Sequence, residues 1–292
     1  MNKLVSIIIP THNRPKMLSR ALASVMNQKY GNMEIIIIDD SNNEANKIEN
    51  ENLIKKLNDK RIIYLHTNGS EGGGKARNIG IERSNGSYIA FLDDDDIWLK
   101  NKLKKQMEKF KLDESICAVY CIYDVYDERG VKIRKIRHRN RGDIYKKLLH
   151  SFCISETSSI IIKKGALKKI NGFDTSLVSN QEYDLYLRLS EHCNFDFVDE
   201  VLINKIESEK ERISSNFNKK TEGLKQFFKK HKMRYKNLPI KDRIYFQIRY
   251  IALYLLFTLG KIIGPDIYKF IYYLKKHHNY PRKSIHKILQ KK

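Results

Sequence analysis

Four consecutive aspartates, Asp93 to Asp96, directly follow the apolar run Tyr88 to Leu92. Carboxylates packed this closely repel one another unless a cation or hydrogen-bond donors neutralise them. Magnesium and manganese prefer oxygen ligands, commonly one or two carboxylates together with substrate phosphates. Acids also favour the first turn of a helix, but one or two would satisfy that preference. The tract therefore favours a divalent metal site that stabilises charge on a departing phosphate group.

A second acidic pair, Asp39 and Asp40, follows the β-branched run Glu34 to Ile38 in the same way. One interpretation is a turn or a helix cap, because short acidic side chains satisfy free backbone N–H groups there. The other is a carboxylate that accepts hydrogen bonds from a nucleotide base or ribose. The residue types leave both interpretations open.

A glycine-rich segment, Gly69 to Asn78, lies between a predicted strand and a predicted helix. Backbone N–H groups and a helix N-terminus can hold phosphate in that setting. Two of its glycines and Lys75 match the spacing of a P-loop, but Ala76 stands where that loop needs Ser or Thr to hold magnesium. We therefore disfavour a P-loop NTPase and expect Lys75 and Arg77 to face phosphate oxygens.

The stretch Gln181 to Leu189 predicts an amphipathic helix with Leu185 and Leu189 on one face. Glu182 and Asp184 fall in its first turn. They fit either ordinary helix-start acids or a general base that takes the proton of an attacking hydroxyl. The sequence pattern favours neither interpretation over the other.

Apolar runs and amphipathic stretches alternate along the first 112 residues. This alternation predicts an α/β fold with a mostly parallel sheet and helices on both faces. Ligands bind beyond the carboxyl ends of the strands in such a sheet, so the polar clusters that follow the strands should converge on one crevice. The predicted strands are residues 5–9, 34–38, 61–65 and 87–92, the predicted helices 16–28, 46–57, 76–83 and 99–112, and the polar clusters 11–14, 39–42, 66–77 and 93–96.

We predict a catalytic domain at residues 1–204, with a nucleotide-binding half at 1–112 and an acceptor-binding half at 113–204. The second half contains expected strands near 118–126 and 158–162, a basic loop around 132–141 and a helix at 182–192. Through Asn204 the chain has 33 Lys and Arg against 28 Asp and Glu, whereas the remainder has 23 against 6. Residues 205–292 therefore predict a basic helical extension drawn to an anionic partner.

Cysteine usage and the N-terminus both indicate a cytoplasmic setting. The chain opens without the pattern of a secretory signal. The four cysteines lack the spacing of a zinc site: Cys117, Cys121, Cys153 and Cys193. The spacing of Cys117 and Cys121 in a β-rich stretch is typical of ordinary core residues, and this fits a reducing compartment.

Six motifs, in this order and at this spacing, resemble the family 2 glycosyltransferases of GT-A fold. They are VSIIIPTHNR, IIIIDDSN, GKARNIG, YIAFLDDDDIW, NGFD and QEYDLYLRL, and the likeness covers residues 4–199. The resemblance implies a Rossmann-like GT-A domain that transfers a sugar from a nucleotide-diphospho-sugar to a hydroxyl of a glycan or lipid-linked glycan. It further implies inversion at the anomeric carbon with Mg²⁺ or Mn²⁺, in the synthesis of a surface polysaccharide or glycolipid.

Residue by residue, the resemblance assigns the polar clusters to the nucleotide-sugar. It implies that the base and ribose are surrounded by Thr11, Asn13, Arg14 and Asp40. Arg77 would lie near the diphosphate.

The same resemblance separates the roles of the acids. Asp93 and Asp95 match the two acids of the family's DxD motif, with Asp95 as the direct metal ligand. Asp94 matches the variable middle position, and Asp96 is left as a helix-start residue. Glu182 falls on the position of the catalytic base, which is usually Asp in a Glu-Asp pair, whereas here the pair is Gln-Glu.

The most hydrophobic part of the extension is Ile244 to Ile263. A spanning helix needs about 20 predominantly apolar residues, and Gln247, Arg249 and Lys261 interrupt any window of that length. Tyrosines flanked by Lys and Arg are typical of an interfacial helix on anionic lipid. A helix packed on the catalytic domain explains the pattern equally well, so peripheral membrane contact is one of two interpretations.

Three other functions compete with sugar transfer. A nucleic-acid-binding protein would suit the pI of 9.7, but the basic residues lie outside the domain with the motifs, and the expected crevice is acidic. A nucleotidyltransferase uses similar carboxylates and metal but releases pyrophosphate. An inactive GT-A module would bind a nucleotide-sugar without chemistry, and the presence of Asp93, Asp95 and Glu182 argues against it.

Overall fold

A computed structural model of the chain describes residues 3–207 and 217–263. The chain separates into two compact units, Met1–Glu211 and Arg212–Lys292. The last strand of the first unit continues to Glu207, past the predicted domain limit at Asn204. The parts of the predicted extension at 208–216 and 264–292 lie outside the described residues.

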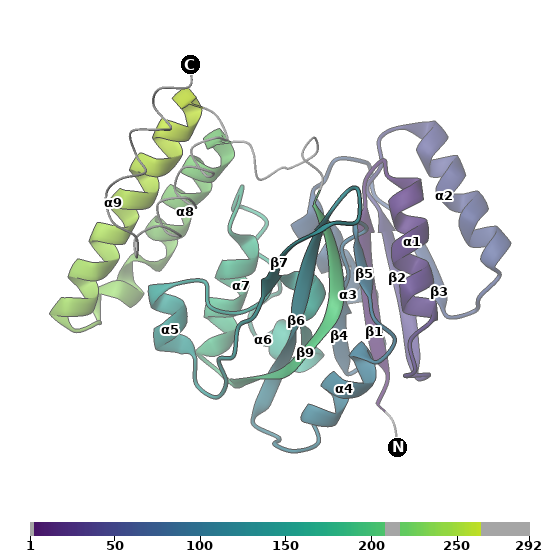
Figure 1. Cartoon of the computed structure of the whole chain (residues 1–292), viewed down its shortest axis with the longest axis horizontal. Coiled ribbons are helices and arrows are strands. Elements are labelled where there is room, and N and C mark those ends of the chain that lie inside the picture. The colour runs from purple at the N-terminus through teal and green to yellow at the C-terminus, as the bar shows by residue number, and fades with distance from the viewer. Residues whose placement is uncertain (1–2, 208–216, 264–292) are drawn as a thin grey trace. The chain divides into compact units, whose positions relative to one another are not determined.

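The first unit is built around one mixed sheet flanked by helices (Figure 1). Its strands, in spatial order, are β3 (Ile62–His66), β2 (Met33–Asp39), β1 (Val5–Thr11), β4 (Tyr88–Phe91), β8 (Ile161–Lys163), β6 (Ile116–Asp127), β9 (Asn194–Glu207) and β5 (Asp96–Trp98), and β7 (Lys132–Ile136) pairs with β6. Neighbours among β3, β2, β1 and β4 run parallel, as do β6 and β9. The predicted α/β class with a mostly parallel sheet is confirmed.

Helices connect these strands and cover the sheet (Figure 1). They are α1 (Pro15–Met26), α2 (Glu44–Leu57), α3 (Gly73–Arg83), α4 (Lys102–Lys109), α5 (Tyr145–His150), α6 (Lys164–Lys169) and α7 (Gln181–Ser190), with a 3-10 turn, η1, at Thr157–Ser159. The isoleucines of β1 and β2 are fully buried because strands of this kind are covered on both faces. Val5, Ile7 and Ile9 pack in the same cluster as side chains of α1 and α4.

Two local predictions are wrong. Asp96 does not begin a helix: it begins β5, which pairs antiparallel with β9 from Asp96↔Lys205 to Trp98↔Ile203. The following helix therefore starts only at Lys102. The predicted basic loop at 132–141 is in part the strand β7. Both strands are defined by partners elsewhere in the chain, so the local pattern alone does not indicate them.

The prediction of Cys117 as an ordinary core cysteine is also wrong, because this residue is disulfide-bonded. Cys117, in β6, and Cys193, just before β9, form a disulfide across a Cα–Cα distance of 5.7 Å. Cys121 and Cys153 are free. The bonded cysteines are 76 residues apart in the sequence, and the pairing of β6 with β9, with Ile116 opposite Asn194, brings them together.

The second unit consists, among the described residues, of α8 (Phe217–Lys236) and α9 (Ile240–Ile263). The two helices pack through aromatic side chains, with the rings of Phe228 and Phe246 stacked at 4.2 Å between centroids. None of the helices in the described part of the chain combines the length and the apolar character needed to cross a membrane.

Candidate active site

The acidic tract occupies the turn between β4 and β5, and the neighbouring η1 turn fixes its backbone. The N–H of Asp93 donates to the Ser158 hydroxyl at 3.0 Å. The carbonyl of Ser158 accepts the indole N–H of Trp98 at 2.9 Å. Each end of the tract is thus bonded to one residue of η1, which holds the four carboxylates at the carboxyl edge of the sheet.

Asp93, Asp95 and Asp96 form the cluster at the centre of the site. One carboxylate oxygen from each lies within 4.8 Å of the others. Asp96 is buried, and its Oδ1 has no hydrogen-bond partner. Burial raises the pKa of Asp96 well above its usual range, the Lys205 ammonium opposes this, and Asp93 and Asp95 raise it further. The three clustered carboxylates fit a hard divalent cation, because they offer oxygen ligands and one of them, Asp96, has a buried oxygen that accepts no hydrogen bond.

Asp94 turns away from this cluster toward the first strand. Its carboxylate accepts the Thr11 hydroxyl at 2.8 Å and lies 3.5 Å from the Arg14 guanidinium. Arg14 also lies 3.6 Å from Asp95. Burial raises the pKa of Asp94 to about 6. The residue at the variable middle position is therefore a direct link between the acidic tract and the segment after β1.

Arg77 extends from α3 to Asp93, with 2.5 Å between its Nη2 and the carboxylate. Burial alone would raise the pKa of Asp93, but Arg77 and Lys205 outweigh it, and the pKa is lowered. The close approach of α3 and α7 depends on Gly74, because a Cβ there would lie 2.4 Å from the amide oxygen of Gln181. That contact brings the start of α7 beside Arg77.

The structure separates the two acids at the start of α7. Asp184 is buried and pairs with Arg188 at 2.6 Å, and Arg188 also donates to the carbonyls of Ile170 and Gly172. Asp184 therefore holds α7 to the loop after α6. Glu182 instead interacts electrostatically with Arg77, Asp93 and Glu156. Burial raises its pKa, Asp93 and Glu156 add to the rise, and Arg77 opposes it.

Glu156 and Lys205 also belong to the site, and they do not stand out in the sequence. Lys205 forms an ion pair with Glu156 and lies opposite Asp96 in the β5–β9 register. Burial lowers the pKa of the Lys205 ammonium, but Asp96, Glu156 and Asp93 outweigh that, and the pKa is raised well above its usual range. Only the long-range pairing of β9 with β5 brings this cation to the acidic tract.

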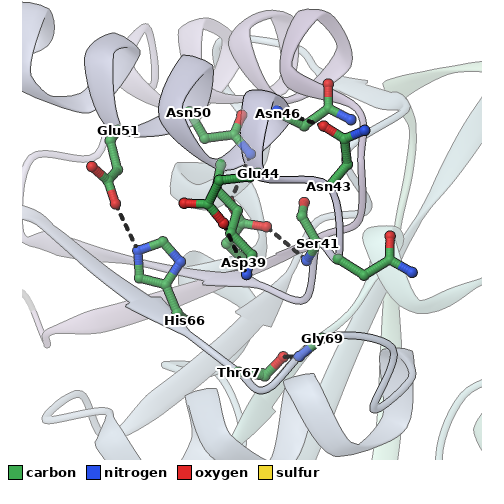
Figure 2. A network of polar contacts seen from close by, with 12 residues as sticks. Asp39, Ser41, Asn43, Glu44, Asn46, Asn50, Glu51, His66, Thr67 and Gly69 are labelled. Carbon is green, nitrogen blue, oxygen red and sulfur yellow. Dashed lines mark hydrogen bonds and ion pairs between the residues drawn. The ribbon is translucent and has the colours of Figure 1, made fainter.

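The second acidic pair, Asp39 and Asp40, forms hydrogen bonds to the segments near the ends of β2 and β3. Asp40 accepts the backbone N–H groups of Glu71 and Gly72 at 2.9 and 2.8 Å and also accepts the Thr67 hydroxyl. It therefore fixes the start of the glycine-rich segment, and the Thr67 hydroxyl accepts the N–H of Gly69 (Figure 2).

Asp39 is fully buried and accepts hydrogen bonds from three residues. Its partners are the Ser41 N–H at 2.9 Å, the Asn50 amide at 2.8 Å and the Tyr64 hydroxyl at 2.5 Å. Figure 2 shows Asp39 between Ser41 and Asn50, beneath α2. Asp39 is thus a structural residue that holds α2 and β3 to the end of β2.

Two other predicted site residues are Asn13, which contacts the segment after β2, and Lys75, which lies on the surface. Asn13, with φ at 57°, donates its N–H to the Ser41 hydroxyl at 2.8 Å and its side-chain amide to Asn42 at 2.7 Å. The segments after β1 and β2 are therefore joined. Lys75 forms an ion pair with Glu71 on the surface, so the structure does not bring it to the acidic centre.

Comparison with known proteins agrees with this geometry. Residues 6–170 match the model of "Glycosyl transferase family 2". An uncharacterized glycosyltransferase of Rickettsia bellii is 34% identical over 188 residues, which cover 64% of this chain and 26% of that protein. The chain thus spans about a quarter of that relative's length.

Two further matches cover more of their own length. The UDP-Glc:alpha-D-GlcNAc-diphosphoundecaprenol beta-1,3-glucosyltransferase WfgD of Escherichia coli is 28% identical over 214 residues, covering 73% of this chain and 80% of WfgD. The structure of the mannosyltransferase PcManGT from Pyrobaculum calidifontis, in complex with GDP-Man and Mn²⁺, superposes with a TM-score of 0.62 at 14% identity, covering 96% of this chain and 81% of that one.

The sheet and its flanking helices form a GT-A type of fold, in agreement with the superposition on PcManGT. Because the family model matches more than half of its residues, the chain belongs to glycosyltransferase family 2.

Proposed function

We propose that the protein transfers a sugar from a nucleotide-diphospho-sugar to a hydroxyl of a glycan or lipid-linked glycan, with inversion at the anomeric carbon. The observation that carries this proposal is the meeting of Asp93, Asp95, Arg77 and Glu182 at one edge of the sheet. A transfer of this kind needs charge stabilisation on the diphosphate side and a base on the acceptor side. Arg77 lies between the acids that would supply these two functions.

Asp93, Asp95 and Asp96 would hold Mg²⁺ or Mn²⁺ at the cluster described above. A bound divalent cation would supply Lewis-acid stabilisation of the departing nucleoside diphosphate. Arg77 would face the same phosphates. The predicted metal ligands were Asp95 and Asp93, and the position of Asp96 adds it to this proposal.

The nucleotide would lie against the segments at the ends of β1 and β2. Thr11, Asn13 and Arg14 belong to the first of these segments, and Asp40 holds the neighbouring glycine-rich loop. Both oxygens of Asp40 already accept hydrogen bonds from the loop, so its role in binding is to position that loop. Lys75 would take part only by leaving Glu71 for a phosphate oxygen.

Glu182 would act as the general base. Its carboxylate takes the proton of the acceptor hydroxyl while the hydroxyl oxygen bonds to the anomeric carbon. The bond from that carbon to the diphosphate oxygen breaks on the opposite face, and the nucleoside diphosphate leaves with the electron pair. The raised pKa of Glu182 makes its carboxylate a stronger base than an ordinary glutamate.

The acceptor class follows from the relatives rather than from the site. WfgD is named for a diphosphoundecaprenol-linked acceptor, which supports a lipid-linked glycan and a role in making a surface polysaccharide or glycolipid. Such an acceptor suits an enzyme at the cytoplasmic face of a membrane, with the basic helices α8 and α9 near the lipid.

A donor screen tests the proposed function. The protein is incubated with UDP- and GDP-sugars and Mn²⁺, and both thermal stabilisation and release of nucleoside diphosphate are measured. We expect one donor to stabilise the fold and to be slowly hydrolysed or transferred, and we expect Asp95→Asn to do neither. Pyrophosphate release from a nucleoside triphosphate would instead indicate a nucleotidyltransferase, and binding of a donor without any turnover would indicate an inactive module.

A further inference from the structure

Helix α9 has a stripe of exposed aliphatic side chains along its whole length. They are Ile240, Ile244, Ile248, Ile251, Leu255, Leu259 and Ile262, and each is at least 47% exposed. We call these seven residues the apolar stripe. Exposed aliphatic residues are ordinary when scattered, but a continuous row marks a surface that another body covers.

The opposite side of α9 already has its partner. Phe246 and Tyr250 stack on Phe228 of α8, each at 4.2 Å between ring centroids. Near the end of α9, a Cβ at Gly260 would lie 2.1 Å from the Phe217 ring, so the two helices touch closely there. The packing of α8 and α9 therefore uses the other face and does not account for the apolar stripe.

The spacing of the apolar stripe suits a flat surface. Successive members are four, four, three, four, four and three residues apart, an average of about 3.7, close to the 3.6 residues of a straight helical turn. A left-handed coiled coil with a second copy requires an average of 3.5. The spacing therefore does not fit a left-handed coiled coil and keeps the apolar stripe on one side of α9.

The charged residues of α9 indicate which kind of surface would cover the apolar stripe. Lys241, Arg243, Arg249 and Lys261 belong to this helix, and Asp242 is the one acid within it. Helices that lie in a lipid interface combine an apolar face with Lys and Arg beside it, and those cations favour anionic headgroups. No helix in the described residues can span a bilayer, so α9 would lie along the membrane.

We propose that the apolar stripe of α9 lies in the interface of an anionic lipid bilayer. This proposal deepens the proposed function, because it identifies the face that would bring the first unit to a lipid-linked acceptor. Its contacts are distinct from the site residues, so membrane binding and sugar transfer can be measured separately.

The test compares the full chain with an Ile248→Gln, Leu255→Gln double variant in vesicle flotation. The vesicles are phosphatidylcholine alone or with about one third phosphatidylglycerol. We expect the wild-type chain to float with the anionic vesicles only, and the double variant to bind at least about tenfold more weakly. Met233→Gln is the matched control, because Met233 is 63% exposed on α8 and outside the apolar stripe.

Circular dichroism and donor-induced stabilisation with Mn²⁺ confirm in each variant that the fold and the site are intact. Equal flotation of the double variant would overturn the proposal, and so would equal binding to neutral vesicles. A wild-type dimer that the double variant disrupts, without vesicle binding, would assign the stripe to a second copy. Asp95→Asn should float like the wild type. The flotation result can therefore be interpreted even if the protein fails to transfer sugar.

Discussion

Two acidic segments follow buried strands in this protein, and the structure treats them in opposite ways. Asp39, at the end of β2, accepts hydrogen bonds from three residues, and Asp40 accepts two backbone N–H groups and a hydroxyl. The tract after β4 instead brings Asp93, Asp95 and Asp96 together, and Asp96 retains a buried oxygen without a partner.

The pKa shifts express the same difference. Burial would raise the pKa of Asp39, but its hydrogen bonds outweigh burial and lower it. Burial raises the pKa of Asp95 and Asp96, and neighbouring carboxylates raise it further. Acids whose oxygens accept hydrogen bonds from within the chain stabilise the fold, whereas a clustered acid with a buried oxygen that accepts none, such as Asp96, is available to a ligand. The two segments should therefore respond differently to substitution.

The largest effect is expected at Asp95. Asp95→Asn should lower the rate of sugar transfer by about a thousandfold or more, because a bound cation contributes several kcal/mol of charge stabilisation. The melting temperature without metal should stay the same or rise, since one of three clustered carboxylates loses its charge. Activity assays and thermal melts of the variant measure the two quantities.

Excess chelator should abolish transfer by the wild-type enzyme to the same extent. Glu108→Gln, on the exposed side of α4, is the matched control and should leave both measurements unchanged. Full turnover by Asp95→Asn, or by the wild type in chelator, would refute the metal assignment and remove the contrast between the two segments.

Glu182 should give the next effect. Glu182→Gln should lower kcat by about a hundred- to ten-thousandfold with little change in the KM for the donor, because a general base acts on the acceptor hydroxyl. The carboxylate must be deprotonated to act, and its pKa is raised above 4.5. The wild-type rate should thus fall with decreasing pH at a point above pH 4.5, and the residual rate of Glu182→Gln should lack that step.

Glu182→Asp keeps the carboxylate but shortens its reach, and should retain more activity than Glu182→Gln. A donor KM that rises with unchanged kcat would indicate a binding role instead. An unchanged rate in Glu182→Gln would exclude the residue as the base.

A substitution of Asp39 tests the acidic pair whose oxygens accept hydrogen bonds from within the chain. Asp39→Ala should lower the free energy of unfolding by about 2–4 kcal/mol, since it leaves the Asn50 amide and the Tyr64 hydroxyl without their acceptor. The folded pKa is lowered, so this stabilisation is complete above the ordinary value of 3.8 and is lost as pH falls through the lower folded value. The difference from wild type in denaturant melts should therefore shrink below about pH 3.8.

Asp59→Ala is the control for Asp39, because Asp59 pairs with Arg61 near the surface. Its loss should cost less than about 1 kcal/mol. If Asp39→Ala were as stable as Asp59→Ala, the hydrogen-bonded network in Figure 2 would not stabilise the fold as argued.

The sequence predicts the parts of this arrangement that depend on local pattern. The β-branched runs of β1, β2 and β4 indicate buried parallel strands, and the ends of those strands indicate where polar residues meet. Thr11 and Arg77 indeed contact the acidic tract.

Long-range pairing defines the parts that the sequence pattern does not predict. The short strand β5 exists because Asp96–Trp98 pairs with β9, and that pairing places Lys205 beside the tract. The pattern also does not separate Asp39 from Asp40, or Glu182 from Asp184, because all four are acids at the end of a strand or the start of a helix. Only the positions of partners such as Arg188 and Asn50 assign their roles.

The smallest expected effect concerns Lys205, a cation that lies beside the acidic tract, opposite Asp96. Lys205→Met should strengthen Mn²⁺ binding by about three- to tenfold, because a positive charge opposite Asp96 repels a cation bound to the same carboxylates. The melting temperature without metal should fall, since the acids and Glu156 lose their counter-charge. Metal titration by calorimetry and melts with and without Mn²⁺ measure both effects.

Lys205→Arg keeps the charge and should resemble the wild type in both measurements. Glu156→Gln releases Lys205 from its ion pair and leaves it free to approach the aspartates, so it should weaken Mn²⁺ binding. Weaker metal binding in Lys205→Met would mean that the ammonium supports the metal site by orienting its ligands. In that case the tract, like Asp39, would depend on an internal partner, and the contrast between the two acidic segments would be one of degree.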